Sequence, residues 1–519
     1  MKFSTENNQK AWIYAVLAAA IVSFTFINAY PISILDEAKN AEAAREMWVS
    51  GNYWVPKFNG ELRTDKPPLH YYFMLLGFKL FGTTVLGARF FSAIMGFVML
   101  LTTFGFARRH LGKDVAQTTL LILVGSFFFM QEFHLAVPDP YLIAFVTLGL
   151  FSFYHFYVTK KSLYLVLFYF FLALGVLSKG PVAIALPGLS VGLFLVLQKA
   201  LKNTFRYYPV LGLLGIALLV VPWFWQVHLK TDGLWTQGFF FDHNINRFSA
   251  PMEGHGGSFF VTWGFVLLGL LPFSFFIPQA FRHTWQKRTN PVLVFASCVA
   301  AVFILFFCIS STKLPNYTMP GYAFLALLLG AFFTKKIHVG FSRWDIISVV
   351  LLTLLGLALP VAAYIGMQQE ATLVSLSYLA FGLAPTAIGT LLGFVFYFRK
   401  KITAFLLTTA FSWGILLFIL HGYLYPNLTP VLPTTAVAEV LPKDASIVVY
   451  KRMDAAFPFN YQQTFEVIDN INDATNLHGF YLLTNHPEGQ DLEKLPNIEL
   501  VIRRKALFEN HTTVLYRIE

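Results

Sequence analysis

Long apolar runs recur along most of this 519-residue chain, from Trp12 to Tyr423. A helix needs about 20 mostly apolar residues to cross the roughly 30 Å of hydrocarbon in a bilayer, and helices satisfy their own backbone groups there. The sequence therefore predicts an α-helical polytopic membrane protein with about 13 transmembrane helices, at 11–30, 85–107, 115–133, 140–158, 162–178, 181–198, 209–227, 258–280, 291–310, 316–334, 345–366, 373–398 and 402–423.

The composition agrees, because only 13% of the residues are charged whereas about a quarter are charged in a soluble domain. The first run, Ala11 to Tyr30, follows Lys2 and Lys10 but has no small-residue cleavage site, which favours a retained helix over a signal peptide. Cys298 and Cys308 lie in one apolar run, so the sequence provides no disulfide framework or cysteine metal site.

The net charge of +11 is distributed unevenly between alternate connections. One set of loops holds nineteen basic and three acidic residues, the opposite loops up to residue 434 hold eleven and twelve, and the tail from Thr435 holds eight and twelve. This is the positive-inside pattern. It predicts a cytoplasmic N-terminus and an external tail, and it explains the basic residues without a nucleic-acid partner.

The outer loops 31–84 and 228–257 are long and rich in charged and aromatic side chains, so we expect function on the outer face of a transmembrane domain at 1–434. Residues 435–519 have the composition of a small soluble α/β extracytoplasmic domain, with strands expected at Ser446–Tyr450, Phe480–Thr484, Ile498–Ile502 and Thr513–Ile518. A lid, an acceptor-docking module and a purely structural cap are all compatible with this segment.

Two acidic residues, Asp36 and Glu37, follow the first predicted span and open a helix that should end near Gly51. Asp36 suits a helix N-cap, whose carboxylate accepts a backbone N–H bond. It also suits a general base that takes a proton from a sugar acceptor, with Glu37 raising its pKa by like-charge repulsion. The two roles are compatible with one another.

Further charged residues lie at the predicted outer surface. Lys66, in Arg63-Thr64-Asp65-Lys66-Pro67-Pro68, can bind a phosphate, and an ordinary Asp65–Lys66 surface pair is the alternative. Asp139 lies between two apolar spans, where an ionised group is costly and points to function unless it caps a helix. Lys179 and Lys313 end two spans and either extend to the interface or hold a lipid phosphate.

The second long outer loop gathers ligand-type side chains that can bind a divalent metal ion. His243, Glu253 and His255 combine with Asp65 and Asp139 as candidate nitrogen and oxygen ligands. Their spacing matches no defined metal motif, so the metal ion is only an optional cofactor.

Five short motifs, taken in order, resemble those of a known superfamily. They are Asp36-Glu37, Asp65-Lys66-Pro67-Pro68, Val137-Pro138-Asp139-Pro140, Ser178-Lys179-Gly180-Pro181 and Lys313-Leu314-Pro315-Asn316-Tyr317. Their order resembles that of the aminoarabinose lipid A transferase and protein O-mannosyltransferase superfamily, the GT-C membrane glycosyltransferases. Two departures, Lys39 in the first motif and Arg63-Thr64-Asp65-Lys66 in the second, put the donor-phosphate set and the metal ligands in doubt.

The resemblance implies a monomer in the bacterial inner membrane that uses an undecaprenyl-phosphate sugar as donor and lipid A, a glycan or a protein as acceptor on the periplasmic face. It implies catalytic residues Asp36 and Glu37, donor-phosphate residues Lys66, Arg247, Lys313, Tyr317, Lys39 and Arg63, and acceptor or pocket residues Asp65, Asp139, Lys179 and His255. The implied metal ligands are Asp65, Asp139, His243 and Glu253.

The expected reaction is a single displacement that inverts the anomeric carbon while fixed cations stabilise the leaving phosphate. The main alternative is a transporter or flippase of a lipid-linked sugar. Transporters place charges at mid-membrane, often in paired repeats, whereas the candidate groups here cluster at one surface. A scaffold without catalysis is disfavoured by the concentration of Asp, Lys, His and Arg in two outer loops.

Overall fold

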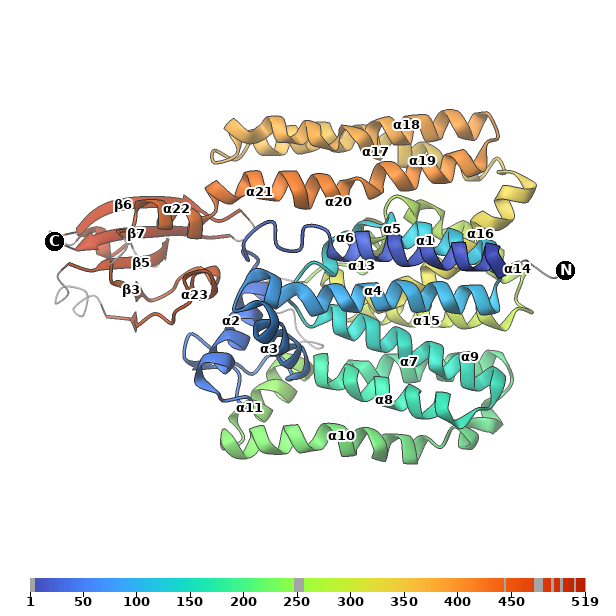
Figure 1. The fold of residues 1–519 in the computed structure, drawn as a ribbon, viewed down its shortest axis with the longest axis horizontal. Coiled ribbons are helices and arrows are strands. Elements are labelled where there is room, and N and C mark those ends of the chain that lie inside the picture. The colour runs from blue at the N-terminus through green and yellow to red at the C-terminus, as the bar shows by residue number, and fades with distance from the viewer. Residues whose placement is uncertain are drawn as a thin grey trace.

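Helices aligned along one axis make up most of the protein, as the computed structural model in Figure 1 shows. The structure describes residues 5–246, 256–442, 445–470, 479–486, 490–494, 498–507 and 510–518. The two termini lie at opposite ends of this bundle (Figure 1). The helices of the bundle are α1 (Thr5–Phe24), α4 (Val85–His110), α5 (Lys113–Val124), α6 (Phe127–Glu132), α7 (Asp139–Thr159), α8 (Ser162–Lys179), α9 (Val182–Leu197), α10 (Pro209–Lys230), α13 (Phe259–Gly269), α14 (Ile277–Gln286), α15 (Pro291–Ile309), α16 (Tyr322–Val339), α17 (Asp345–Gln368), α18 (Ala384–Phe398), α19 (Ile402–Gly414), α20 (Leu416–Ile419) and α21 (Tyr425–Leu428).

Within the described residues, nine helices are long and apolar enough to cross a membrane, and ten if the bent pair α13 and α14 is one span. Each of the thirteen predicted segments falls on a helix. The apolar stretches Gln9–Phe24 of α1 and Val182–Leu197 of α9 are shorter than a span, the segment 115–133 is divided between α5 and α6, and the bent pair turns by 116°. The polytopic membrane fold is confirmed, and the count of about 13 is not.

Two helices outside the bundle carry the first outer loop. They are α2 (Leu35–Ser50) and α3 (Leu69–Phe81), joined by the hairpin of β1 (Lys57–Phe58) and β2 (Glu61–Leu62). The alanines that recur every three residues in α2, Ala38, Ala41 and Ala44, are fully buried against α3 and the C-terminal region, as their spacing predicts. The helix ends at Gly51, whose φ of 67° suits a left-handed cap.

The C-terminal region is a five-stranded sheet of order β4-β3-β5-β7-β6, mixed in direction. Its elements are α22 (Pro433–Val440), β3 (Ile447–Tyr450), α23 (Ala456–Tyr461), β4 (Val467–Ile468), β5 (Tyr481–His486), β6 (Ile498–Lys505) and β7 (Thr512–Ile518). Successive residues alternate between two apolar clusters, with Leu482 in one and Leu483 in the other, which follows from the two-residue period of a strand. The expected α/β character and all four expected strands are present, and among the described residues of this region the two-residue β4 is the one strand that was not predicted.

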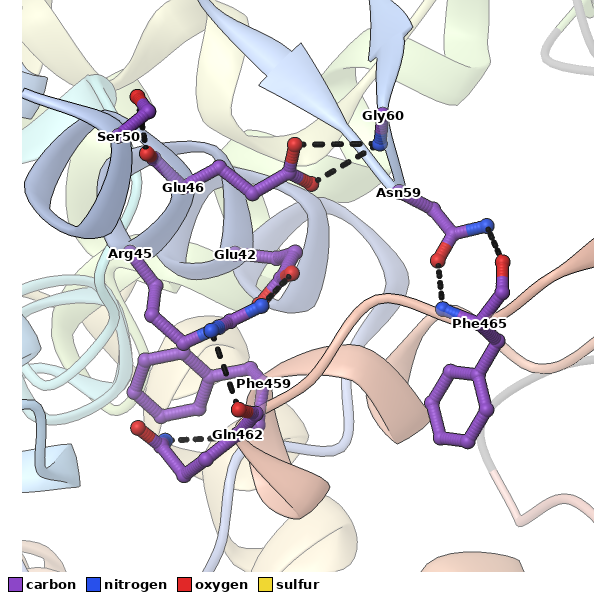
Figure 2. A network of polar contacts seen from close by, with 9 residues as sticks. All are labelled: Glu42, Arg45, Glu46, Ser50, Asn59, Gly60, Phe459, Gln462 and Phe465. Carbon is purple, nitrogen blue, oxygen red and sulfur yellow. Dashed lines mark hydrogen bonds and ion pairs between the residues drawn. The ribbon is translucent and has the colours of Figure 1, made fainter. Parts of the chain in front are cut away.

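The expected boundary between residues 434 and 435 falls inside α22, and Val437 of that helix packs in the core of the sheet. The sheet lies at the end of the bundle where α2 and α3 are found (Figure 1). Figure 2 shows the contact: Asn59 of the hairpin exchanges hydrogen bonds with the backbone of Phe465 at 3.0 and 2.7 Å, and Arg45 donates to the carbonyl of Gln462 at 3.1 Å. The C-terminal region therefore braces the first outer loop.

Candidate functional site

Asp36 lies in the first turn of α2 with 42% of its side chain exposed. The Asn40 amide donates to its carbonyl at 2.7 Å and to its carboxylate at 3.2 Å. The N-cap residue of α2 is Ile34, and no side chain caps this end. The expected N-cap role of Asp36 is therefore wrong, because its carboxylate faces other side chains and not the free N–H groups of the helix.

Asn40 connects Asp36 to the second motif. Its side-chain oxygen lies 3.1 Å from the His70 ring and accepts from the Arg63 guanidinium at 3.4 Å and the Tyr71 hydroxyl at 3.3 Å. Arg63 also donates to the Tyr71 hydroxyl at 3.1 Å. All of these partners of Asn40 are buried, so the network holds the start of α2 at a fixed distance from the Arg63–Lys66 segment.

Arg63 carries the positive charge between two carboxylates. Its guanidinium lies 3.7 Å from Asp36 and 3.2 Å from Asp65. Burial alone would raise the pKa of Asp36, but the charges of Lys66, Arg63 and Lys179 outweigh it and lower the pKa to about 2. The expected rise is therefore wrong, and Asp36 is a firmly ionised carboxylate.

Trp235 and His243, from the second long loop, also contact the Arg63–Lys66 segment. The His243 ring lies 3.0 Å from Asp65, and the Trp235 indole of α11 (Leu234–Gln237) donates to the Arg63 carbonyl at 2.8 Å. A Cβ at Gly238 would lie 2.7 Å from the Thr64 hydroxyl, so only glycine allows this approach. Burial would raise the pKa of Asp65, but Arg63 and His243 lower it.

Lys179 ends α8 and pairs with Asp139, the first residue of α7. The Asp139 side chain is 1% exposed and the Lys179 side chain 12%. The ammonium also lies 5.2 Å from the centre of the Tyr317 ring. Lys179 is therefore held in a buried pair and does not extend to the interface, and Asp139 does not act as a side-chain cap for α7.

Two adjoining cavities meet at these residues, and five residues line both: Asp65, Lys66, Lys179, His243 and Tyr317. The first, here called the apolar chamber, has a volume of about 480 Å³, and its other lining residues are mainly apolar side chains of α7, α9 and α15 such as Leu142, Val182 and Phe306. The second has a volume of about 520 Å³ and is called the polar chamber because Asp36, Lys39, Gln131, Glu132 and Asn316 also line it, although apolar side chains such as Phe128, Leu268 and Met319 form much of its wall. The expected residues thus converge where a largely apolar space joins one that also holds charged groups.

Unlike Asp36, which lines the polar chamber, Glu37 pairs with Arg89 of α4. Its carboxylate accepts from the Arg89 guanidinium at 2.7 and 2.8 Å and from the Ala136 backbone N–H at 2.8 Å. It is fully buried and is not among the residues that line either chamber. The expected catalytic role of Glu37 therefore has no geometric support, and the structure assigns it to holding α2 against α4.

Lys313 is buried, and its ammonium donates to the Ser310 carbonyl, so it lines neither chamber although Tyr317 lines both. Arg247, Glu253 and His255 lie outside the described residues, and their expected roles stay predictions. Among the described residues, no three His, Cys, Asp or Glu side chains gather as metal ligands. Asp139 already binds an ammonium, so of the described candidates only Asp65 and His243 are placed together.

Three residues that sequence reasoning passed over belong to this region: Asn40, Arg89 and Glu132. Asn40 follows Asp36 by four residues, the spacing that places two side chains on one helix face. Arg89 and Glu132 are ionisable residues inside predicted membrane spans, which is a default signal of function or pairing.

Comparisons with known proteins show what the chain is similar to. The family model for dolichyl-phosphate-mannose-protein mannosyltransferase matches residues 65–225. An uncharacterized protein of Aquifex aeolicus is 30% identical over 63% of this chain and 64% of its own. The undecaprenyl phosphate-alpha-4-amino-4-deoxy-L-arabinose arabinosyl transferase of Aeromonas hydrophila is 31% identical over 58% of this chain and 56% of its own.

The crystal structure of ArnT from Cupriavidus metallidurans bound to undecaprenyl phosphate covers 97% of both chains with a TM-score of 0.81 and 20% sequence identity. The chain therefore has the fold of this membrane glycosyltransferase. The segment that matches the mannosyltransferase family model includes Lys66, Asp139 and Lys179, while Asp36 and Tyr317 lie on either side of it. The chain spans about three fifths of the length of the curated relatives that it matches.

Proposed function

We propose that the protein is a glycosyltransferase that moves a sugar from a polyprenyl-phosphate carrier to an acceptor at the membrane surface. The observation that carries the proposal is the junction of the apolar and polar chambers at two lysines, the buried Lys66 and Lys179, whose side chain is 12% exposed. A polyprenyl-phosphate sugar has an apolar chain, one phosphate and a polar sugar in that order. Undecaprenyl phosphate, the lipid in the ArnT crystal structure, has the first two parts.

The donor phosphate would lie at the junction of the two chambers. Lys66 and Lys179 line both chambers and supply positive charge there, and Tyr317 lines the same place. Buried cations interact more strongly with a phosphate than surface ones do, because little water screens them. Arg63 stands behind the junction and holds Asp36 and Asp65 in place.

The reaction would be a displacement at the anomeric carbon. The acceptor oxygen forms a bond to that carbon while the bond to the phosphate oxygen breaks, and the electron pair leaves with the phosphate, which becomes the free polyprenyl phosphate. The two lysines stabilise the charge that develops on the leaving phosphate. Attack from the polar chamber, opposite the leaving group, inverts the anomeric centre.

Asp36 would orient the acceptor in the polar chamber and take its proton where the acceptor has one. A carboxylate with a pKa of about 2 is a weak base, so it suits an acceptor oxygen that is already ionised. A phosphate meets that condition, and a lipid A phosphate is the first acceptor to test, with a glycan or protein hydroxyl as the alternative.

We place the protein in a bacterial inner membrane, with the N-terminus in the cytoplasm and the C-terminal sheet in the periplasm. The uneven loop charge supports this orientation. The opposite positions of the two termini and the position of α2 beside the sheet also fit it (Figure 1). The reaction would then take place at the periplasmic surface.

The test is sugar transfer by purified protein in detergent, with a panel of undecaprenyl-phosphate sugars as donors and total membrane lipid as acceptor. We expect transfer by the wild type, its loss in Lys66→Ala, and in Asp36→Asn a loss for a hydroxyl acceptor but only a reduced rate for a phosphate acceptor. Asp114→Asn and Lys79→Ala, which alter exposed residues outside both chambers, are matched controls. Absence of transfer and of donor hydrolysis by folded wild type would refute the proposal and favour a lipid-linked sugar transporter.

A further inference from the structure

Three contacts join the C-terminal residues 460–465 to the first outer loop. They follow the same order along both segments, and they are Asn460 with Ile32, Gln462 with Arg45, and Phe465 with Asn59. The second and third are drawn in Figure 2. Ile32 precedes α2, Arg45 lies within it and Asn59 follows it, so the contacts hold this helix before its start, along its length and beyond its end.

The short helix α23 also packs directly on α2. Its residues Ala456 and Phe459 belong to one buried cluster with Ile32 and the alanines of α2. The position of α23 is itself fixed, because Asp454 accepts from the Ala456 N–H at 2.8 Å and the Tyr461 hydroxyl donates to a carbonyl of α22 at 3.1 Å. Closely packed side chains transmit a shift from one element to the next, so the position of α2 depends on α23.

The C-terminal region affects the chambers only indirectly, because none of its described residues lines either one. The start of α2 and the residue before it supply Ile34, Asp36 and Lys39 to the polar chamber. The two lysines at the junction come from elsewhere, since Lys66 follows the hairpin and Lys179 ends α8. A shift at the start of α2 would therefore move the acceptor side of the polar chamber and leave the phosphate side in place.

We propose that Asn460 is a positioning residue that sets the start of α2, and with it Asp36, against the polar chamber. Its amide donates to the Ile32 carbonyl and to the Ala456 carbonyl, each at 2.7 Å, and the second bond fixes the amide on α23. Ile32 is fully buried, so water does not replace a lost donor at its carbonyl. Glu37 holds the same turn against α4. This inference rests on the proposed function, because Asp36 acts in that reaction.

The experiment compares Asn460→Leu, which keeps the size of the side chain but has no donor, with Asn427→Leu as the matched control. Asn427 also donates to the carbonyl four residues before it at 2.7 Å, but it lies in α21 and lines neither chamber. We expect Asn460→Leu to lower kcat by about 10-fold or more with an unchanged KM for donor, because a misplacement of about 1 Å can cost about 10²-fold. Asn460→Gln, which keeps the amide, should recover part of the rate, and Asn427→Leu should behave as wild type.

Hydrogen exchange of the folded proteins provides a readout that does not need turnover. We expect the first two turns of α2 to exchange faster in Asn460→Leu than in Asn427→Leu, with exchange in α8 unchanged. Transfer by the wild type supports the proposed function whatever Asn460 does. An unchanged kcat in Asn460→Leu, or an equal loss of donor affinity, would overturn the role of Asn460.

The two hypotheses also separate when the wild type transfers no sugar. In that case the proposed function fails, faster exchange at the start of α2 in Asn460→Leu supports the positioning role, and unchanged exchange overturns it. Asn460→Asp keeps the shape of the side chain and lacks the amide donor. It provides the same comparison, with the same two outcomes, where Asn460→Leu does not fold.

Discussion

Glu37 should stabilise the fold without taking part in the chemistry, and Glu37→Gln tests this. Its carboxylate accepts three hydrogen bonds, two from Arg89 and one from the Ala136 N–H, and both members of the ion pair are essentially unexposed. In Glu37→Gln the Arg89 guanidinium would keep only neutral partners, the carbonyls of Ile27 and Tyr30 at 3.1 Å. Removing one partner of a buried ion pair costs about 3–5 kcal/mol.

That cost corresponds to a fall of about 10²- to 10³-fold or more in the ratio of folded to unfolded protein. The double variant Glu37→Leu/Arg89→Met removes both charges and should recover most of the loss, because an apolar pair of similar volume is often neutral. Glu370→Gln is a matched control, because Glu370 pairs with Lys505 at an exposed position and such pairs contribute about 0–1 kcal/mol.

The assay is unfolding in mixed micelles, followed by tryptophan fluorescence, together with transfer rates per folded molecule. We expect Glu37→Gln to be much less stable than Glu370→Gln and to keep the wild-type pH profile of transfer. A Glu37→Gln protein with wild-type stability but a lost rate or a shifted pH profile would refute the reasoning. It would place Glu37 in the chemistry after all.

Other variants test the site directly. Asp36→Asn should lower kcat by about 10²- to 10⁴-fold for a hydroxyl acceptor and less for a phosphate, as measured with each acceptor in turn. Because the folded pKa of Asp36 is about 2 against 3.8 unpaired, its contribution to stability is present above about pH 4 and lost as the pH falls towards 2. The transfer rate should therefore show no loss from this group at pH 5, and an acidic limb there that disappears in Asp36→Asn would contradict it. Lys66→Met should raise the KM for donor by about 10-fold or more if Lys66 binds the phosphate, and an unchanged KM would exclude that role. Arg45→Met removes the hydrogen bond to Gln462 and leaves Glu42 buried without its partner, so the C-terminal region should become sensitive to protease before the bundle does.

Much of the fold could be predicted because its signals are local. A long run of apolar residues predicts a span, and a short run rich in β-branched and aromatic residues predicts a strand, as at Thr512–Ile518. The spacing of the alanines and Gly51 likewise gave the buried face and the end of α2. The number of spans was harder to predict. Gly269 and Pro272 lie at the 116° bend between α13 and α14, and Gly125 and Ser126 separate α5 from α6. Proline alone does not identify a break, because Pro187, Pro222 and Pro360 lie inside unbroken helices.

The roles of individual charges depended on partners far away in the sequence. The pair of Glu37 is Arg89, 52 positions later, and the pair of Lys179 is Asp139, 40 positions earlier. Lys313 looked equivalent to Lys179, because both end a membrane span. Its ammonium instead turns back to a carbonyl three residues away, so the two lysines differ in whether they reach the chambers. No spacing rule within one segment distinguishes the two cases.

Asp36 and Glu37 show why neighbours in a motif need not share a function. Successive residues of a helix point about 100° apart, so the first turn of α2 directs one carboxylate into the polar chamber and the other towards α4. Glu37 fixes the position of the helix, and that position brings Asp36 within 3.7 Å of Arg63. The low pKa of Asp36 therefore depends on the Glu37–Arg89 ion pair, which holds the helix in this position.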